Sequence, residues 1–104
     1  MKIIRTTIVT AKPGYTQQVA SLLKDLGEYT ATQPGFIEDY TFDVDGKLGR
    51  ISVWDSHEAA DRAAMHVHTI ALRSQIYNLT LPDRQEGIAV ISGEHHQAKT
   101  LAAA

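Results

Sequence analysis

The chain has 104 residues, a formal net charge of −2 and 43% hydrophobic residues, which fits one small globular domain. It contains no cysteine, which excludes disulfides, thiolate catalysis and cysteine-ligated zinc. No segment concentrates Lys and Arg, so we predict neither a nucleic-acid partner nor binding to a membrane surface. The N-terminal letters MKIIR do not read as a signal peptide, and no apolar run is long enough to span a bilayer, so we expect a cytoplasmic protein.

The first third of the chain predicts a strand followed by a helix. Residues 3–9 are dense in Ile, Thr and Val, which favour the pleated backbone. Pro34-Gly35 ends the helix, because proline removes a backbone donor and restricts the residue before it. The helix itself is indicated by apolar residues at helical spacing, which are Tyr15, Val19, Leu22, Leu23, Leu26 and Tyr29.

A hairpin is predicted next. Alternation after Pro34 places Phe36, Tyr40 and Phe42 on one face of a strand that ends at Val44. Asp45-Gly46 favours the positive φ angles of a two-residue type I′ turn. The return strand is expected over residues 48–54.

A long alanine-rich helical region follows the hairpin. Asp55 and Glu58 stand at capping-box spacing, with Ser56 as an alternative N-cap. The apolar stripe drifts along the helix, which predicts either a bend or two shorter helices that meet near residues 66–68.

The last part of the chain predicts a final strand and a tail. Leu81-Pro82-Asp83 stops the helical region, and residues 88–91 form the strand. Residues 1–94 are therefore expected to make up the domain. The tail over residues 95–104 shows no period and is expected to be disordered or to lie across a partner.

The order β-α-β-β-α-β predicts an α+β fold of the ferredoxin-like kind, with both helices on one face of a four-stranded antiparallel sheet. The first strand has Ile3 and Val9 on one side and Ile4 and Ile8 on the other. Apolar side chains on both faces indicate that something covers the face opposite the helices, and a second copy of the chain is the simplest candidate. We therefore expect a homodimer.

Two groups of motifs resemble the antibiotic-biosynthesis-monooxygenase domain family. The first is Lys12-Pro13-Gly14 before the helix and Gln33-Pro34-Gly35-Phe36 at the strand start; the second is Val53 to Ala60, running on to His66. The resemblance covers roughly residues 2–92 and implies a dimeric α/β barrel with a pocket between sheet and helices. Some members oxygenate aromatic polyketides or quinols with O2 and no metal or flavin, relatives in the superfamily degrade heme, and others have no known reaction.

The resemblance implies a cofactor-independent monooxygenase that oxidises a small aromatic, polyketide or quinol substrate with O2. Trp54 would be the stacking wall for the substrate, and His66 or Tyr40 the polar group that favours its deprotonation. Each also has a purely structural interpretation, as a core anchor, a hydrogen-bonding partner or part of an aromatic packing face. Side chains expected to contact the substrate are Thr6, Phe42, His68 and Arg73.

Two alternatives to the monooxygenase stay open. One is a heme-binding or heme-degrading protein, although residues 5–7 read Arg-Thr-Thr where heme-degrading relatives place an asparagine. The other is a non-catalytic dimer that binds a small ligand. The five histidines fit no standard metal motif, so we predict no metal site and no required cofactor.

Overall fold

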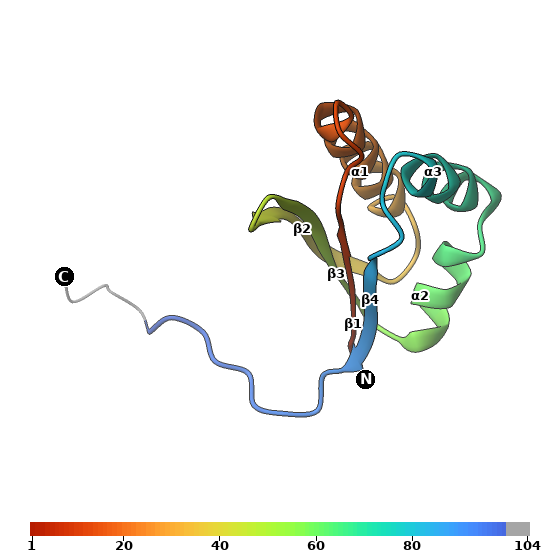
Figure 1. Ribbon diagram of the computed structural model, residues 1–104. Helices are drawn as coiled ribbons and strands as arrows, with labels where there is room; N and C mark the ends of the chain where they lie inside the picture. The colour runs from red at the N-terminus through yellow and green to blue at the C-terminus, as the bar shows by residue number, and fades with distance from the viewer. Residues whose placement is uncertain (100–104) are drawn as a thin grey trace.

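The computed structural model, which describes residues 1–99, is a four-stranded sheet with all its helices on one side (Figure 1). This confirms the predicted α+β ferredoxin-like fold, with the second helical region divided in two. The elements are β1 (Ile3–Val9), α1 (Thr16–Thr30), β2 (Phe36–Val44), β3 (Lys47–Trp54), α2 (His57–Ala64), α3 (Val67–Asn78) and β4 (Gln85–Val90).

The strand order β2-β3-β1-β4 puts β1 and β3 in the centre of an antiparallel sheet. In the β1–β3 register Ile3 lies opposite Trp54 and Val9 opposite Leu48. Ile3 and Val9 are 2% and 1% exposed, so the face that they share is the one under the helices. The intervening residues of β1 face the other way, and we call that second side the open face.

The core consists of two apolar clusters on the helix side of the sheet. One joins Val9 to residues of α1 and α3, and the other joins Ile3 and Trp54 to the alanines of α2. Between these clusters the same face carries polar residues, which are Arg5 and Thr7 of β1 and Arg50 and Ser52 of β3. The middle of the helix-covered face is therefore polar.

The helical region breaks at the predicted place. Ser56 caps α2, since its Oγ accepts a hydrogen bond of 3.1 Å from the backbone N–H of Ala59. His66 caps α3, since its Nδ1 accepts a bond of 3.2 Å from the backbone N–H of His68. Of the two N-cap candidates in the sequence, Ser56 rather than Asp55 fills the role.

The predicted face of β2 is partly wrong because the strand contains a bulge. Phe36 pairs with Trp54, but the register shifts before the next pair, in which Glu38 lies opposite Val53. The extra residue reverses the alternation, so Phe36 faces the helices whereas Tyr40 and Phe42 lie on the open face. The hairpin turn is as predicted, with φ angles of 50° at Asp45 and 78° at Gly46.

The C-terminal segment leaves the sheet after β4. β4 begins at Gln85 rather than Ile88, and residues 91–99 continue without helix or strand, running away from the sheet in Figure 1. The predicted tail extends to residue 104, and its last five residues lie outside the described ones; the boundary at residue 94 stays a prediction. Within residues 1–99, the helices are too short or too polar to cross a bilayer.

Candidate functional site

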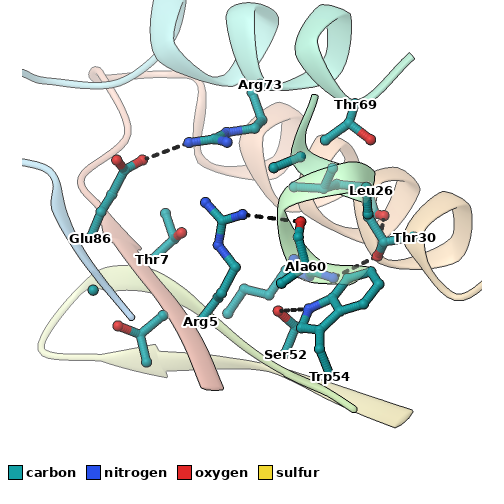
Figure 2. A pocket seen from close by; sticks show the side chains of 15 residues that line it. Arg5, Thr7, Leu26, Thr30, Ser52, Trp54, Ala60, Thr69, Arg73 and Glu86 are labelled. Atoms are coloured by element: carbon teal, nitrogen blue, oxygen red, sulfur yellow. Dashed lines mark hydrogen bonds and ion pairs between the residues drawn. The ribbon is translucent and has the colours of Figure 1, made fainter. Parts of the chain in front are cut away.

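A cavity of about 60 Å³ lies in the polar middle of the helix-covered face, between the sheet and the helices (Figure 2). Its walls come from three strands and all three helices. The apolar ends of β1 and β3 pack under the helices and hold these elements together. Side chains fill only part of the space above the polar stretch between those ends, and the rest is the cavity. Its lining residues are Arg5, Thr6, Thr7, Leu26, Thr30, Arg50, Ser52, Trp54, Ala60, Ala63, Ala64, Thr69, Arg73, Glu86 and Gly87.

Trp54 forms the aromatic end of this cavity. Its side chain is 2% exposed, and its indole N–H donates a hydrogen bond of 3.0 Å to Ser52 Oγ. Phe36 packs edge-on against the indole, with ring centroids 5.4 Å apart and planes at 90°. The indole is therefore held in one orientation, as both a core residue and a wall of the cavity.

Arg50 is a cation whose charge is already matched. Its Nε donates to Asp39 Oδ2 at 3.1 Å and its Nη2 to Thr30 Oγ1 at 2.7 Å. Burial lowers the pKa of Arg50 from its ordinary value, while the Asp39 carboxylate acts in the opposite direction. An arginine remains charged near neutral pH, so this pair is a fixed part of the cavity wall.

A second set of polar groups joins α3 to β4. Arg73 Nη2 donates to Tyr77 Oη at 2.8 Å and to Glu86 Oε1 at 3.4 Å, and the Tyr77 hydroxyl donates to the same carboxylate oxygen. Burial, together with the hydrogen bond to Glu86, raises the pKa of Tyr77 above its ordinary value. The tyrosine therefore remains a neutral donor to Glu86 at physiological pH.

Arg5 differs from the other two arginines of the cavity. Its Nη1 donates a long hydrogen bond of 3.4 Å to the carbonyl oxygen of Ala60, and no carboxylate of residues 1–99 lies within ion-pair distance of it. Burial lowers the pKa of its guanidinium, and the nearby positive charge of Arg73 acts in the same direction. Arg5 is thus a partly buried charge whose donors are largely unused.

The structure brings only some of the predicted site residues together. Trp54 and Arg73 line the cavity, and Thr6 contributes to its wall, although its side chain lies on the open face beside Gly87. Tyr40 and Phe42 lie on the open face, across the sheet from the cavity, because of the bulge in β2. The predicted catalytic pairing of Trp54 with Tyr40 therefore does not occur within one chain.

His66 and His68 lie outside the cavity, at the junction of α2 and α3. His66 Nδ1 accepts the N-cap bond from His68 and also faces Tyr29 Oη at 2.7 Å. An Nδ1 that accepts from a backbone N–H carries no proton, so the Tyr29 hydroxyl is the donor. The His68 ring stacks on Tyr29 with centroids 4.1 Å apart. Both histidines thus make structural contacts in this arrangement.

The cavity does not fit heme. Its lining, as far as the structure describes the chain, includes no histidine, cysteine, methionine or phenol to hold an iron. Residues 1–99 also show no cluster of three or more His, Cys, Asp or Glu side chains that could hold a metal ion. We therefore assign no reaction step to either group.

The site residues predicted from the sequence do not include Arg5, Arg50 or Glu86, which line the cavity. A signal for Arg5 was present, since it stands two residues after Ile3, on the side of the strand that also holds Val9. A charged residue at a core-facing strand position is uncommon unless it is paired or functional. The pairing of Glu86 with Arg73 had no local signal, because it joins residues of a helix and a strand that meet only in the fold.

No protein-family model matches the chain, and no curated protein does. Solved structures do match. Rv0793 from Mycobacterium tuberculosis has a TM-score of 0.84 at 15% identity, over 92% of this chain and 100% of its own. SnoaB, a cofactor-independent oxygenase from Streptomyces nogalater, has a TM-score of 0.73 at 20% identity, over 97% of both chains. An antibiotic biosynthesis monooxygenase has a TM-score of 0.77 at 19% identity, over 88% of this chain and 99% of its own. The chain therefore has the fold of the antibiotic biosynthesis monooxygenases, as its sequence motifs implied.

Proposed function

We propose that the protein is a cofactor-independent monooxygenase that oxidises a phenol or quinol of one or two rings with O2. The main support for the proposal is the cavity, in which the indole of Trp54 lies opposite the guanidinium groups and the Glu86 carboxylate. The fold that the chain shares with SnoaB supports it. Because the cavity is small beside the roughly 300–1,000 Å³ of sites for drug-sized ligands, we propose a compact substrate.

Deprotonation of the substrate is the first step of the proposed reaction. Glu86 is the one carboxylate among the lining residues that the structure describes, and we assign it as the group that accepts the hydroxyl proton. The guanidinium of Arg73, 3.4 Å from Glu86, stabilises the aryloxide that forms. Trp54 packs against the ring and helps to exclude water. We assign the proton to Glu86 rather than to His66 or Tyr40, since neither of these lines the cavity.

The oxygen step uses electrons from the substrate alone, as 1,4-dihydroxynaphthalene illustrates. The aryloxide reduces O2, and its ring carbon beside the oxygenated carbon forms a bond to oxygen. Protonation gives a hydroperoxide with the composition of quinol plus O2. Loss of water breaks the O–O bond and leaves 2-hydroxy-1,4-naphthoquinone, so one oxygen atom enters the product and the other leaves in water.

Oxygen uptake with 1,4-dihydroxynaphthalene tests this proposal. We expect uptake above the buffer rate and, under ¹⁸O2, one labelled atom in the hydroxynaphthoquinone. Glu86→Gln should lower the rate at least 10-fold, because a positioned general base contributes about 10²- to 10⁴-fold. Glu28→Gln, which changes an exposed carboxylate of α1, is the matched control. Uptake at the buffer rate, or unlabelled naphthoquinone with hydrogen peroxide, would contradict the monooxygenase and favour the ligand-binding module.

We also propose that the protein is a homodimer formed through the open face. That face carries Ile4 and Ile8 from β1, Ile51 and Val53 from β3, and Phe42 from β2. Adjacent apolar side chains on an uncovered sheet face indicate an interaction surface, and a second copy of the same face is self-complementary across a two-fold axis. Tyr40, which is 61% exposed in the single chain, would be covered in this dimer.

A further inference from the structure

The three arginines of the cavity differ in whether a carboxylate lies next to them. Arg5, Arg50 and Arg73 all line the cavity, and two of the three have a carboxylate within ion-pair distance. Asp39 lies 3.1 Å from Arg50, and Glu86 lies 3.4 Å from Arg73, so each of these carboxylates already has its cation. Arg5 is the one of the three without an ion pair in residues 1–99, and Asp61 and Glu86 favour its charge only from a longer distance.

Arg5 has hydrogen-bond donors that the described residues leave free. A guanidinium offers five N–H donors in a planar fork that matches a carboxylate, and in residues 1–99 Arg5 uses one of them, on Ala60 at 3.4 Å. Its partial burial and the charge of Arg73 nearby lower the pKa of Arg5, and the opposite effect of the Asp61 and Glu86 carboxylates does not offset them. A bound anion would relieve both penalties at once.

A second, independent feature points to a ligand at the opposite end of the cavity. Thr69 is 3% exposed and lines the cavity, yet its Oγ1 has no hydrogen-bond partner anywhere in the described part of the chain. A buried hydroxyl without a partner costs about 1–3 kcal/mol, so native proteins rarely keep one without a use. A polar substituent on a bound molecule would satisfy it.

The two ends of the cavity differ in character, which orients the ligand. Figure 2 shows Arg5, Arg73 and Glu86 on one side and Trp54, Leu26 and Thr69 on the other. An anionic group therefore fits at the Arg5 end, with an apolar ring against the indole. Glu86 does not cancel this preference, because Arg73 and Tyr77 already bind its carboxylate.

We propose that the cavity binds aromatic carboxylates, with Arg5 as the residue that binds the carboxylate group and sets this specificity. The proposal rests on the proposed function, since it names the substrate class of the same site: a hydroxylated aromatic ring that bears a carboxylate. Its test is a binding experiment that needs no turnover, so its failure and that of the oxygen chemistry are separable.

Calorimetric titration with 2-naphthoate and the neutral 2-naphthamide compares two ligands that share a ring system. We expect the wild-type protein to bind the carboxylate at least 10-fold more tightly. Arg5→Gln should remove that difference while binding of the amide is retained, and Arg5→Lys should restore part of it, since lysine keeps the charge but loses the fork. Arg62→Gln, which changes an exposed arginine of α2, should leave the preference intact.

The single tryptophan locates the binding. Trp54 gives the one indole N–H resonance of the protein, and naphthoate should shift it in a ¹H–¹⁵N spectrum. Equal affinities for the two ligands, no binding of either, or a preference that survives in a folded Arg5→Gln protein would each overturn the proposal. If naphthoate binds preferentially but the protein does not speed oxygen uptake with the quinol, the aromatic-carboxylate proposal stands and the monooxygenase is refuted.

Discussion

The polar and apolar side chains are distributed over the two faces of the sheet in the reverse of the way that burial alone predicts. Under the helices, β1 reads Ile3, Arg5, Thr7, Val9, with charge and hydroxyl in the middle. On the open face, the same strand presents Ile4 and Ile8, which are half-buried in the single chain. The covered face is polar at its centre, and the uncovered face is mainly apolar.

Each face carries a feature that the stability of a single chain does not explain. Partly burying a guanidinium without a carboxylate is costly, so the helix side is organised for something besides stability. Leaving neighbouring isoleucines partly exposed on the open face is also unfavourable, and a protein interface is a common reason for it. The arginine is the reason for the proposed ligand, and the isoleucines are a reason for the proposed dimer.

Trp54→Ala tests the apolar part of the helix-covered face and should have the largest effect. It removes a nearly fully buried indole between α2, Phe36 and the sheet, so we expect the free energy of unfolding to fall by about 3–5 kcal/mol. Urea denaturation measures this loss. Trp54→Phe keeps most of the buried area and should cost less than half as much. A loss below 1 kcal/mol for the alanine variant would show that the indole is not a core residue.

Ile51→Asp tests the open face. A charge in the middle of a self-associating sheet face should weaken dimerisation at least 100-fold, which corresponds to about 2.7 kcal/mol. Light scattering on a gel-filtration column at micromolar concentration measures the mass. The matched control is Ile70→Asp, at a 45%-exposed isoleucine of α3 on the other side of the sheet, and it should remain dimeric. A monomeric wild-type protein would refute the proposed interface.

His66→Ala tests whether oxygen uptake depends on His66 at the junction of α2 and α3 or only on the residues of the cavity. Loss of the N-cap of α3 should lower stability by about 1 kcal/mol, and His66→Asn, which retains a capping acceptor, should lower it less. Oxygen uptake per folded molecule should not change. A large fall in uptake with unchanged stability would return His66 to the role first predicted for it.

Tyr77→Phe tests the polar contacts at the edge of the cavity and should have the smallest effect. The raised pKa of Tyr77 means that the folded state holds this proton more tightly than the unfolded state. Its contribution to stability is therefore complete below about pH 10 and is lost as the pH rises through the raised value. Urea midpoints at pH 8 and above pH 10 should differ less in Tyr77→Phe than in the wild type.

Tyr15→Phe, at an exposed tyrosine before α1, is the control for that experiment. The urea midpoint of Tyr77→Phe should still depend somewhat on pH, because the hydrogen bond to Glu38 and its charge also raise the pKa of Tyr40 on the open face. An unchanged difference between the two midpoints in Tyr77→Phe would show that Tyr77 does not contribute to it.

The order and type of the elements could be predicted because each is encoded locally. The apolar stripe of α1, the Asp45-Gly46 turn and the drift of the stripe near His66 are all visible in neighbouring residues, and the structure has each of them where expected. The bulge after Phe36 could not be predicted, because nothing in that stretch signals an extra residue. That one residue moved Tyr40 and Phe42 to the face opposite the cavity.

Local patterns in the sequence are enough to predict the α+β fold, the apolar residues on both sides of β1 and the place of Trp54 at the end of β3 before α2. These follow from periodicity and turn chemistry, which act over a few residues. The meeting of Arg5, Arg73 and Glu86 across the cavity from the indole, and the role of His66 as a helix cap, depend on the tertiary structure. Those contacts join residues distant in the chain, and they depend on strand register and on where a helix breaks, which local patterns do not specify.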